Sequence, residues 1–302
     1  MAETVLGRGG TSGAAGGQDF GCTLDVCPRR RRPTVWRSPA FLLGAAVIGT
    51  VLVVALLAPW LSSGNPNAVD IGQRLLAPSR THPFGTDQFG RDMMSRIFYG
   101  ARLAFLMAGG ATALSLVLGG TLGVVAGYYG RWLDRILSTV VEIWMALPGL
   151  LLALVLVAAF GPSIRNATLA LGLTGIPYLF RTTRGCVLSS RQEMFVDAAA
   201  AVGVGSARII RCYILPQLFS TLIVIVTLRM STVLLAGGAL SFIGLGAQPP
   251  TPEWGALLSS GREYMRSAWW LATFPGVAFA LTVMGLNLLG DGLRDVTDPL
   301  AQ

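Results

Sequence analysis

The stretch AFLLGAAVIGTVLVVALLAPW, residues 40–60, contains no charged side chain and decides the class of this protein. A helix rises about 1.5 Å per residue, so about 20 apolar residues cross the hydrocarbon core of a bilayer. No small-residue cleavage site ends the stretch, which argues against a removable signal peptide. The stretch therefore predicts an uncleaved first membrane-spanning helix.

Five further apolar blocks follow, at residues 103–127, 136–160, 167–183, 217–244 and 268–290. Each is near or above the length that spans a bilayer as a helix. The block at 167–183, the fourth predicted span, is the shortest and contains Gly172, Gly175 and Pro177, so we expect it to be kinked or to end early. The pattern predicts an all-α, polytopic membrane protein with six transmembrane helices and both termini on one side.

The composition supports this class and excludes several others. Of the 302 residues, 53% are hydrophobic and 13% are charged, with a mean hydropathy of +0.61. A soluble chain of this length carries about 25% charged residues. All 23 basic residues are arginines, and they lie between the apolar blocks rather than along one amphipathic face. We therefore expect membrane lipid, and no nucleic acid, as a partner.

The placement of the arginines predicts the orientation. With both termini inside, fourteen arginines fall on the cytoplasmic side and eight on the outer side, which agrees with the positive-inside rule. Residues 1–38 are rich in Gly, Ser and Arg and predict a disordered cytoplasmic tail. Residues 39–302 then form the membrane domain, with a first span at 40–60, an outer loop at 61–100 and a core at 101–291. That loop could also contain an amphipathic helix with Arg91, Arg96 and Arg102 on its polar face.

The most informative segment is FVDAAAAVGVGSARIIRCYILP, residues 195–216, between the fourth and fifth predicted spans. Residues 194–202 predict a short alanine-rich helix, which Gly203 and Gly205 end. Ser206 can cap a second, amphipathic helix, and Pro216 can begin the fifth span. Small side chains let another protein approach the backbone closely, so the segment suits docking to a partner. From the residues alone, an ordinary loop rich in alanine is equally compatible with this pattern.

The segment resembles the "EAA" motif of ABC importer permeases, in which an acidic residue, two alanines and a glycine precede a Leu-Pro pair. The matching residues are Asp197, Ala198, Ala199, Gly203, Leu215 and Pro216. The resemblance implies that residues of about 194–213 form coupling helices in a cleft of an ATP-hydrolysing subunit. The implied contact residues are Phe195, Val196, Asp197, Ala198, Ala199, Gly203 and Arg208. Tyr213 stands where the family often has a histidine.

Other stretches narrow the family. HPFGTDQFGRD (82–92), SRIFYGAR (95–102), ALSFIGLGAQPPTPEWG (239–255) and NLLGDGLRDVTDP (287–299) resemble the C-type permease subunits of dipeptide, oligopeptide and nickel importers. The resemblance extends from about Arg37 to the C-terminus. Gly237 departs from it, because many relatives have a glutamate there.

The resemblance implies a type I importer permease in the cell inner membrane that forms half of a translocation pathway for dipeptides or oligopeptides. A nickel or other small-solute importer is the alternative. The implied partners are a second homologous permease, two ATP-binding subunits and an extracytoplasmic substrate-binding protein. ATP and magnesium would bind to the partner ATPases, and we expect no cofactor in this chain.

Two charged residues fall within predicted spans, Glu142 and Arg229. A charge inside a membrane usually faces the bundle interior, a partner or water. Both are therefore candidates for the pathway, and they could pair with each other. Glu142 is close to the end of its block, so a position at the membrane surface is an alternative for it.

The remaining residue types argue against an enzyme. No predicted span contains histidine or lysine, and no Gly-x-x-x-x-Gly-Lys-Ser/Thr phosphate loop occurs. His82 is the only histidine, and the four cysteines lack the spacing of metal ligands, so we expect no metal site. An autonomous secondary transporter stays open as a less favoured alternative.

Overall fold

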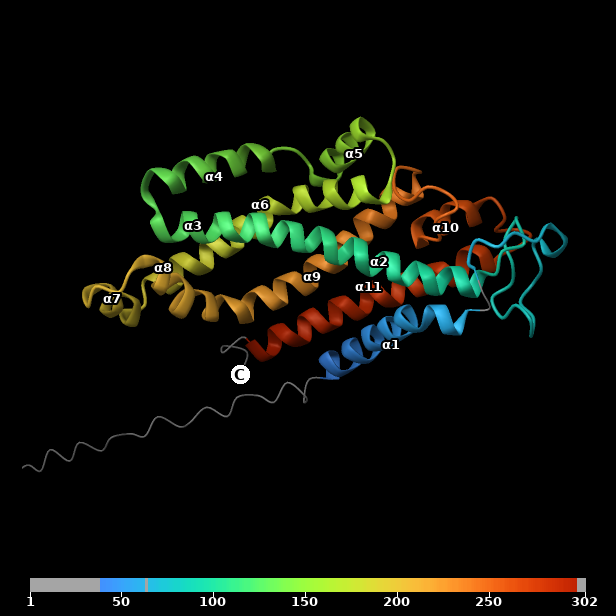
Figure 1. Cartoon of the computed structure of the whole chain (residues 1–302), viewed down its shortest axis with the longest axis horizontal. Coiled ribbons are helices and arrows are strands. Elements are labelled where there is room, and N and C mark those ends of the chain that lie inside the picture. The colour runs from blue at the N-terminus through green and yellow to red at the C-terminus, as the bar shows by residue number, and fades with distance from the viewer. Residues whose placement is uncertain (1–38, 63–64, 298–302) are drawn as a thin grey trace, which may run out of the picture. The chain divides into compact units, whose positions relative to one another are not determined.

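The computed structural model describes residues 39–62 and 65–297, and all the regular elements in this part of the chain are helices (Figure 1). The tail expected at residues 1–38 lies outside the described residues. The described residues belong to one unit, Pro33–Gln302. The helices are, in chain order, α1 (Pro39–Leu61), α2 (Met93–Ser115), α3 (Thr121–Tyr129), α4 (Arg131–Met145), α5 (Gly149–Phe160), α6 (Ile164–Arg191), α7 (Met194–Ala201), α8 (Ser206–Ile209), α9 (Leu215–Phe242), α10 (Trp254–Arg262) and α11 (Trp270–Thr297).

Three short helical turns complete the chain: the 3₁₀ turn η2 (Ile71–Gln73) and the π turns η3 (Leu116–Gly120) and η4 (Ile210–Ile214). Because η3 and η4 continue the helices on either side, α2 to α3 and α8 to α9 are two continuous helices of 37 residues each.

Within the described part of the chain, four helices are long and apolar enough to cross a membrane. They are Pro39–Leu61, Met93–Tyr129, Ser206–Phe242 and Trp270–Asp295. The predicted third span is broken, because α4 and α5 meet at an angle of 81°; if the pair is one span, the count is five. Pro148 follows the end of α4, and the residue before a proline disfavours helical geometry. The predicted count of six is therefore not confirmed, although the all-helical class is.

The predicted fourth span differs from expectation in length. α6 does not end early: it runs through Gly172, Gly175 and Pro177 for 28 residues, from Ile164 to Arg191. Because it contains polar residues, α6 is not among the four helices that are apolar enough to cross a membrane. Much of α6 is buried against α2, α3, α5 and α9, and a helix enclosed by other helices does not need to be apolar all round.

Glycines on η3 and α3 bring this part of the continuous helix close to α6. A Cβ atom on Gly119, Gly123 or Gly127 would lie 2.5, 2.8 or 3.0 Å from a backbone oxygen of α6. This small-xxx-small spacing is typical of membrane helices in close contact. α1 contacts α11 in the same way, since a Cβ on Gly44 would lie 2.4 Å from the Leu289 nitrogen.

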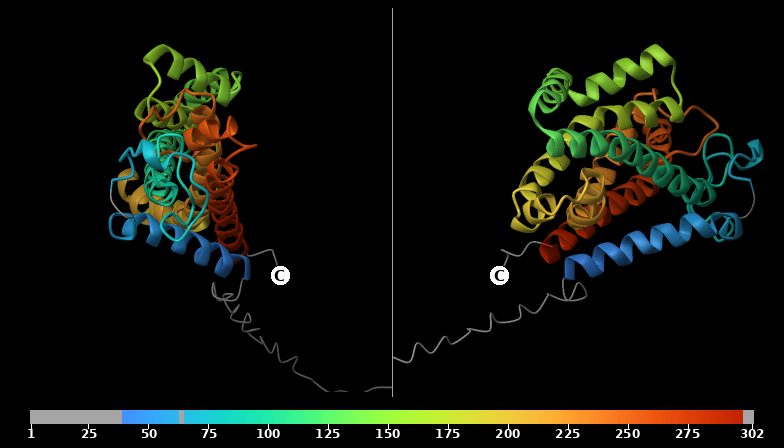
Figure 2. Two further views of the ribbon diagram at one scale, coloured as in Figure 1. Left: turned by 90° about the vertical axis from the view of Figure 1, so that its right-hand side faces the viewer. Right: turned by 60° about the vertical axis from the view of Figure 1, so that its left-hand side comes forward.

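The bundle has two distinct ends. Figures 1 and 2 show α7 and α8 toward the end at which α1 begins and α11 finishes, with loop 62–92 and α10 at the opposite end. The one regular element among the described residues of this loop is the turn η2, and α2 begins at Met93, so Arg96 and Arg102 belong to α2 and not to a separate amphipathic helix. Asp92 determines this start: its Oδ2 accepts a hydrogen bond from the Ser95 N–H at 2.8 Å.

Candidate functional site

The α7 helix is held to the bundle by one buried side chain. Val196 is 3% exposed and lies in a cluster with Val187 of α6 and residues of the segment that leads into α9, namely Ile209, Ile214 and Leu218. The neighbouring residues Phe195, Asp197 and Ala198 are exposed. The helix therefore presents acidic, aromatic and very small side chains away from the protein.

Gly203 ends α7 in a Schellman motif. Its φ is +86°, its N–H donates to the Ala200 oxygen at 3.0 Å, and the Val204 N–H donates to the Ala199 oxygen at 3.0 Å. Only glycine adopts this φ without strain. Gly205, two residues later, has a φ of −63° and is the N-cap of α8. The prediction that Ser206 caps this helix was therefore wrong by one residue.

The charges of the segment are available to a partner. Asp197 lies in the first turn of α7, where the helix dipole favours a carboxylate, and Arg208 lies in the last turn of α8. Both are exposed, and neither forms an ion pair within the described residues. The structure thus brings all seven predicted coupling residues into one segment at one end of the bundle.

Tyr213 packs against this segment. Its ring stacks with the Phe195 ring at a centroid distance of 6.2 Å, and 37% of its surface is exposed. The departure from the family's usual histidine thus places a second aromatic ring beside Phe195.

A π turn connects the segment to the long helix α9. Pro216 has no N–H and is the second residue of α9, one residue after Leu215 follows η4. A π turn shifts the backbone pairing by one residue, which accommodates the proline in a continuous helix. The α8 end of the segment is therefore rigidly joined to α9.

Arg229 lies in the middle of α9 and contacts α6. Its Nη2 donates to the Leu171 oxygen at 3.3 Å, while its Nε is buried without a hydrogen bond among the described residues. A Cβ on Gly175 would lie 2.7 Å from Nη2, so the absence of a side chain there makes room for the guanidinium. Ser115 of α2 lies beside the same glycine.

Glu142 does not pair with Arg229, contrary to one expectation. The described residues show no ion pair between the two. Glu142 is exposed on α4 and interacts electrostatically with Arg184. Arg184 in turn forms a bidentate pair with Asp134, with N···O distances of 2.5 and 2.7 Å. Glu142 therefore belongs to the charged contact between α4 and α6.

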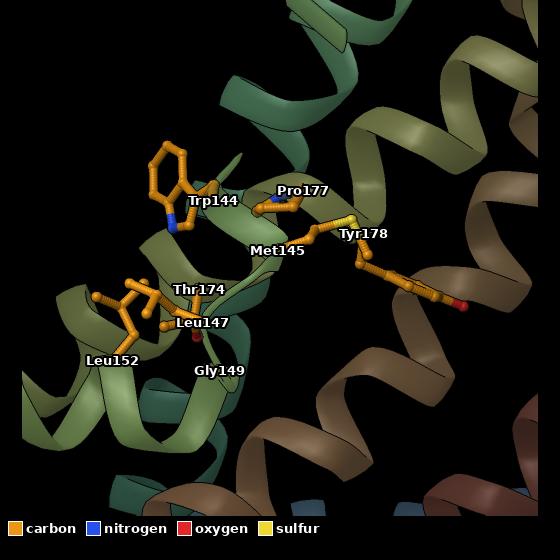
Figure 3. Close-up of a pocket in the computed structure, with 8 residues that line it drawn as sticks. All are labelled: Trp144, Met145, Leu147, Gly149, Leu152, Thr174, Pro177 and Tyr178. Atoms are coloured by element: carbon orange, nitrogen blue, oxygen red, sulfur yellow. The ribbon is translucent and has the colours of Figure 1, made fainter. Parts of the chain in front are cut away.

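A small cavity lies where α4 breaks from α5. Its volume is about 160 Å³, and its lining comes from the break and from the middle of α6 (Figure 3), specifically Trp144, Met145, Leu147, Gly149, Leu152, Thr174, Pro177 and Tyr178. Figure 3 shows the Tyr178 ring extending away from Trp144 and Leu152. The broken helix thus creates an opening beside the centre of α6.

The opposite end of the bundle contains a buried charge cluster that sequence reasoning missed. The Arg91 Nε donates to the Asp87 Oδ2 at 2.6 Å, and the Arg96 Nε lies 3.8 Å from the same oxygen. Arg96 is 3% exposed, and its Nη1 also reaches the oxygens of Pro66 and Pro250, at 3.3 and 3.5 Å. The spacing of opposite charges in TDQFGRD was the signal that could have revealed the Asp87–Arg91 pair.

Trp254 and Trp270 are buried near the end of the bundle opposite α7. The Trp254 indole donates to the Ile97 oxygen at 3.0 Å, and the Trp270 indole donates to the Thr86 oxygen at 3.2 Å. Trp60 and Trp269 are exposed, as an aromatic belt requires.

Beside Trp254, the fully buried Glu253 caps α10 by accepting from the Ala256 N–H at 3.0 Å. Burial raises the pKa of the Glu253 carboxyl, while the N–H groups of Gly255 and Ala256 oppose the rise.

Residues 119–301, which include the α7–α8 segment and Arg229, match the family model described as binding-protein-dependent transport system inner membrane component. The chain belongs to this family. It is therefore a multi-pass membrane permease, and permeases of this kind work with ATP-hydrolysing and substrate-binding components.

Curated relatives are similar over most of the permease. The dipeptide transport system permease protein DppC of Alkalihalophilus pseudofirmus is 44% identical over 258 residues, 85% of each chain. DppC of Escherichia coli is 46% identical over 270 residues, 87% of this chain and 90% of that protein. The probable D,D-dipeptide transport system permease protein DdpC of Escherichia coli is 40% identical over 264 residues, 87% of this chain and 89% of its own.

A solved structure supports the fold. The inward-facing MetNI methionine ABC transporter contains a chain with a TM-score of 0.56 to the permease and 20% identity. The match covers 68% of this chain and 98% of that one. At this identity the likeness concerns the arrangement of the helices alone.

Proposed function

We propose that this permease is the membrane subunit of an ATP-driven importer of dipeptides or short oligopeptides. The observation that carries the proposal is the 44% identity to a dipeptide permease over 85% of both chains. In this proposal the chain forms half of the pathway, and a second, homologous permease forms the other half.

The α7–α8 segment is the proposed docking site for an ATPase, with two ATPases in the complex. The small side chains of Ala198 and Ala199 allow close backbone approach, and Asp197 and Arg208 offer opposite charges without partners in the described chain. ATP and magnesium are bound by those ATPases, and the permease itself carries no cofactor and does no catalysis.

The continuity of the helix supports a route for coupling. A displacement of α8 by the ATPase would move the beginning of α9, because the segment from Ser206 to Phe242 is one helix. α9 carries Arg229 at its centre. In this way a change at the docking site would reach the middle of the bundle.

The proposal also orients the protein in the cell inner membrane. In this proposal the α7 end of the bundle, where α1 begins and α11 finishes, lies in the cytoplasm, and the distribution of the arginines supports this orientation. Loop 62–92 and α10 then face the outside, where a substrate-binding protein would deliver peptide.

The test is co-purification of the complex through a tag on the C-terminus, with the Asp197→Arg variant compared with wild type. Reversal of the exposed charge is expected to remove most of the ATPase while the second permease is retained. Glu263→Arg is the matched control, because Glu263 is also exposed but lies just after α10 at the opposite end. Recovery of the chain alone from wild-type membranes would contradict the proposed importer, and indifference to Asp197→Arg would contradict the docking site.

A further inference from the structure

One face of α6 is exposed although the helix lies within the bundle. Its exposed residues Tyr178, Arg181, Gly185 and Ser189 follow at intervals of three or four, so they lie on a single face. We call these four residues the α6 stripe. Groups such as a guanidinium, a phenol and a hydroxyl are costly against lipid, so a face that carries them within a span faces water or protein.

The first residue of the α6 stripe, Tyr178, lies near the middle of the bundle, close to other polar groups. Tyr178 is at the middle of the 28-residue helix α6, and Arg229 is at the middle of the 28-residue helix α9 that packs against it. Arg229 contacts α6 at Leu171 and beside Gly175, within about two helical turns of Tyr178. The cavity at the α4–α5 break also includes Tyr178. Interrupted helices near the bilayer midplane form the solute sites of many secondary transporters.

The charge of this region is positive and uncompensated. Arg184, on the same helix, is neutralised by Asp134. Arg181 contacts the Met145 sulfur at 3.7 Å, and Arg229 contacts a backbone oxygen at 3.3 Å. Among the described residues neither of these two guanidinium groups forms an ion pair. Two cations without carboxylate partners fit a ligand that brings its own negative group.

We infer that the α6 stripe and Arg229 form a wall of the translocation pathway and that Arg229 and Arg181 hold the terminal carboxylate of the passing peptide. The inference rests on the proposed import of peptides and adds the group that is recognised. The mid-height position disfavours a lipid headgroup as the source of the negative charge, because headgroups lie at the membrane surfaces.

The experiment uses the complete importer in proteoliposomes and two probes, alanyl-alanine and its C-terminal amide. In Arg229→Gln, uptake of alanyl-alanine is expected to fall about tenfold, the usual effect of removing a charged hydrogen bond. Uptake of the amide is expected to change little. Each rate is compared with wild type for the same probe, so the preference of the binding protein cancels. Arg229→Lys should restore part of the preference for the carboxylate, and Arg181→Gln should reduce it less than Arg229→Gln does.

Arg165→Gln is the matched control, because Arg165 is exposed in the first turn of the same helix, away from the stripe. A second measurement does not depend on delivery of the amide. In a chain from which the native cysteines have been removed, Ser189→Cys should react with a membrane-impermeant thiol reagent and be protected by transported alanyl-alanine. Leu169→Cys, on an exposed apolar position of α6, should not react.

The outcomes separate the two proposals. A wild-type complex that imports neither probe would refute peptide import itself. Import of alanyl-alanine at the wild-type rate by Arg229→Gln, or an unreactive Ser189→Cys, would refute the carboxylate site while leaving peptide import intact. Loss of the assembled complex in Arg229→Gln would assign Arg229 to contact between subunits and would also overturn the inference.

Discussion

The two ends of the bundle use charge in opposite ways. At the end with loop 62–92, Asp87, Arg91 and Arg96 are buried and paired, and Glu253 is fully enclosed. At the α7 end, Asp197 and Arg208 are exposed and form no ion pair among the described residues. A buried charge destabilises the folded protein unless it is paired, whereas an exposed charge costs little free energy until another protein covers it. The comparison separates charges that hold the structure together from exposed charges that form no ion pair among the described residues.

The largest expected effect is at the buried cluster. Asp87→Ala leaves Arg91 and Arg96 without their carboxylate in a dry site, which should destabilise the permease by about 3–5 kcal/mol. Thermal unfolding in mild detergent measures the change. Glu263→Ala, which removes an exposed carboxylate near α10, should shift the midpoint very little. An equally small shift for Asp87→Ala would remove the distinction between the two ends.

A smaller effect is expected at the end of α7. Gly203→Ala forces a φ of +86° on a residue with a side chain and should destabilise the local turn by about 1–2 kcal/mol. Gly205→Ala is the control, because its φ is −63° and a Cβ there would meet no atom within 4 Å. Hydrogen exchange of α7 should rise in the first variant and stay unchanged in the second, with global unfolding unaffected in both. Equal exchange in the two variants would show that the motif does not hold α7.

The smallest effect is the pH dependence from Glu253. Its folded pKa is raised above the ordinary value of 4.5, so the folded state binds a proton more tightly than the unfolded state. The contribution of Glu253 to the free energy of unfolding is therefore greatest below about pH 4.5. This contribution is lost as the pH rises through the folded pKa, by at most about 1.4 kcal/mol per pH unit for one group. Glu253→Gln should flatten that part of the curve of unfolding midpoint against pH. An identical curve in the variant would mean that Glu253 is ionised in both states.

Several predictions depended on short stretches of sequence, and the structure agrees with them. The apolar block at 40–60 corresponds to α1, and the helix expected at 194–202 corresponds to α7. Gly203 ends α7, as expected, because helix termination depends on neighbouring backbone groups alone. The family resemblance also rested on short motifs in order, and the family match confirms it.

Other features could not be predicted because they depend on residues far apart in the chain. The block at 136–160 was apolar enough for one straight span; Pro148 disfavours helical geometry within it, but the 81° angle and the cavity beside α6 belong to the folded bundle. The pairing expected between Arg229 and Glu142 failed because the fold directs them to different neighbours, Leu171 and Arg184.

The sequence by itself determined that this protein lies in a membrane, which family it belongs to and where the short helix α7 begins and ends. These properties follow from hydropathy, helix capping and motif order, all of which act over a few residues or turns. Only the tertiary structure decided which charges are buried and which stay open. Arg96 is enclosed by loops 30 and 154 residues away, and the α6 stripe is exposed because no described helix covers it. Burial is a property of the assembled bundle, so the roles of these arginines depend on what surrounds them.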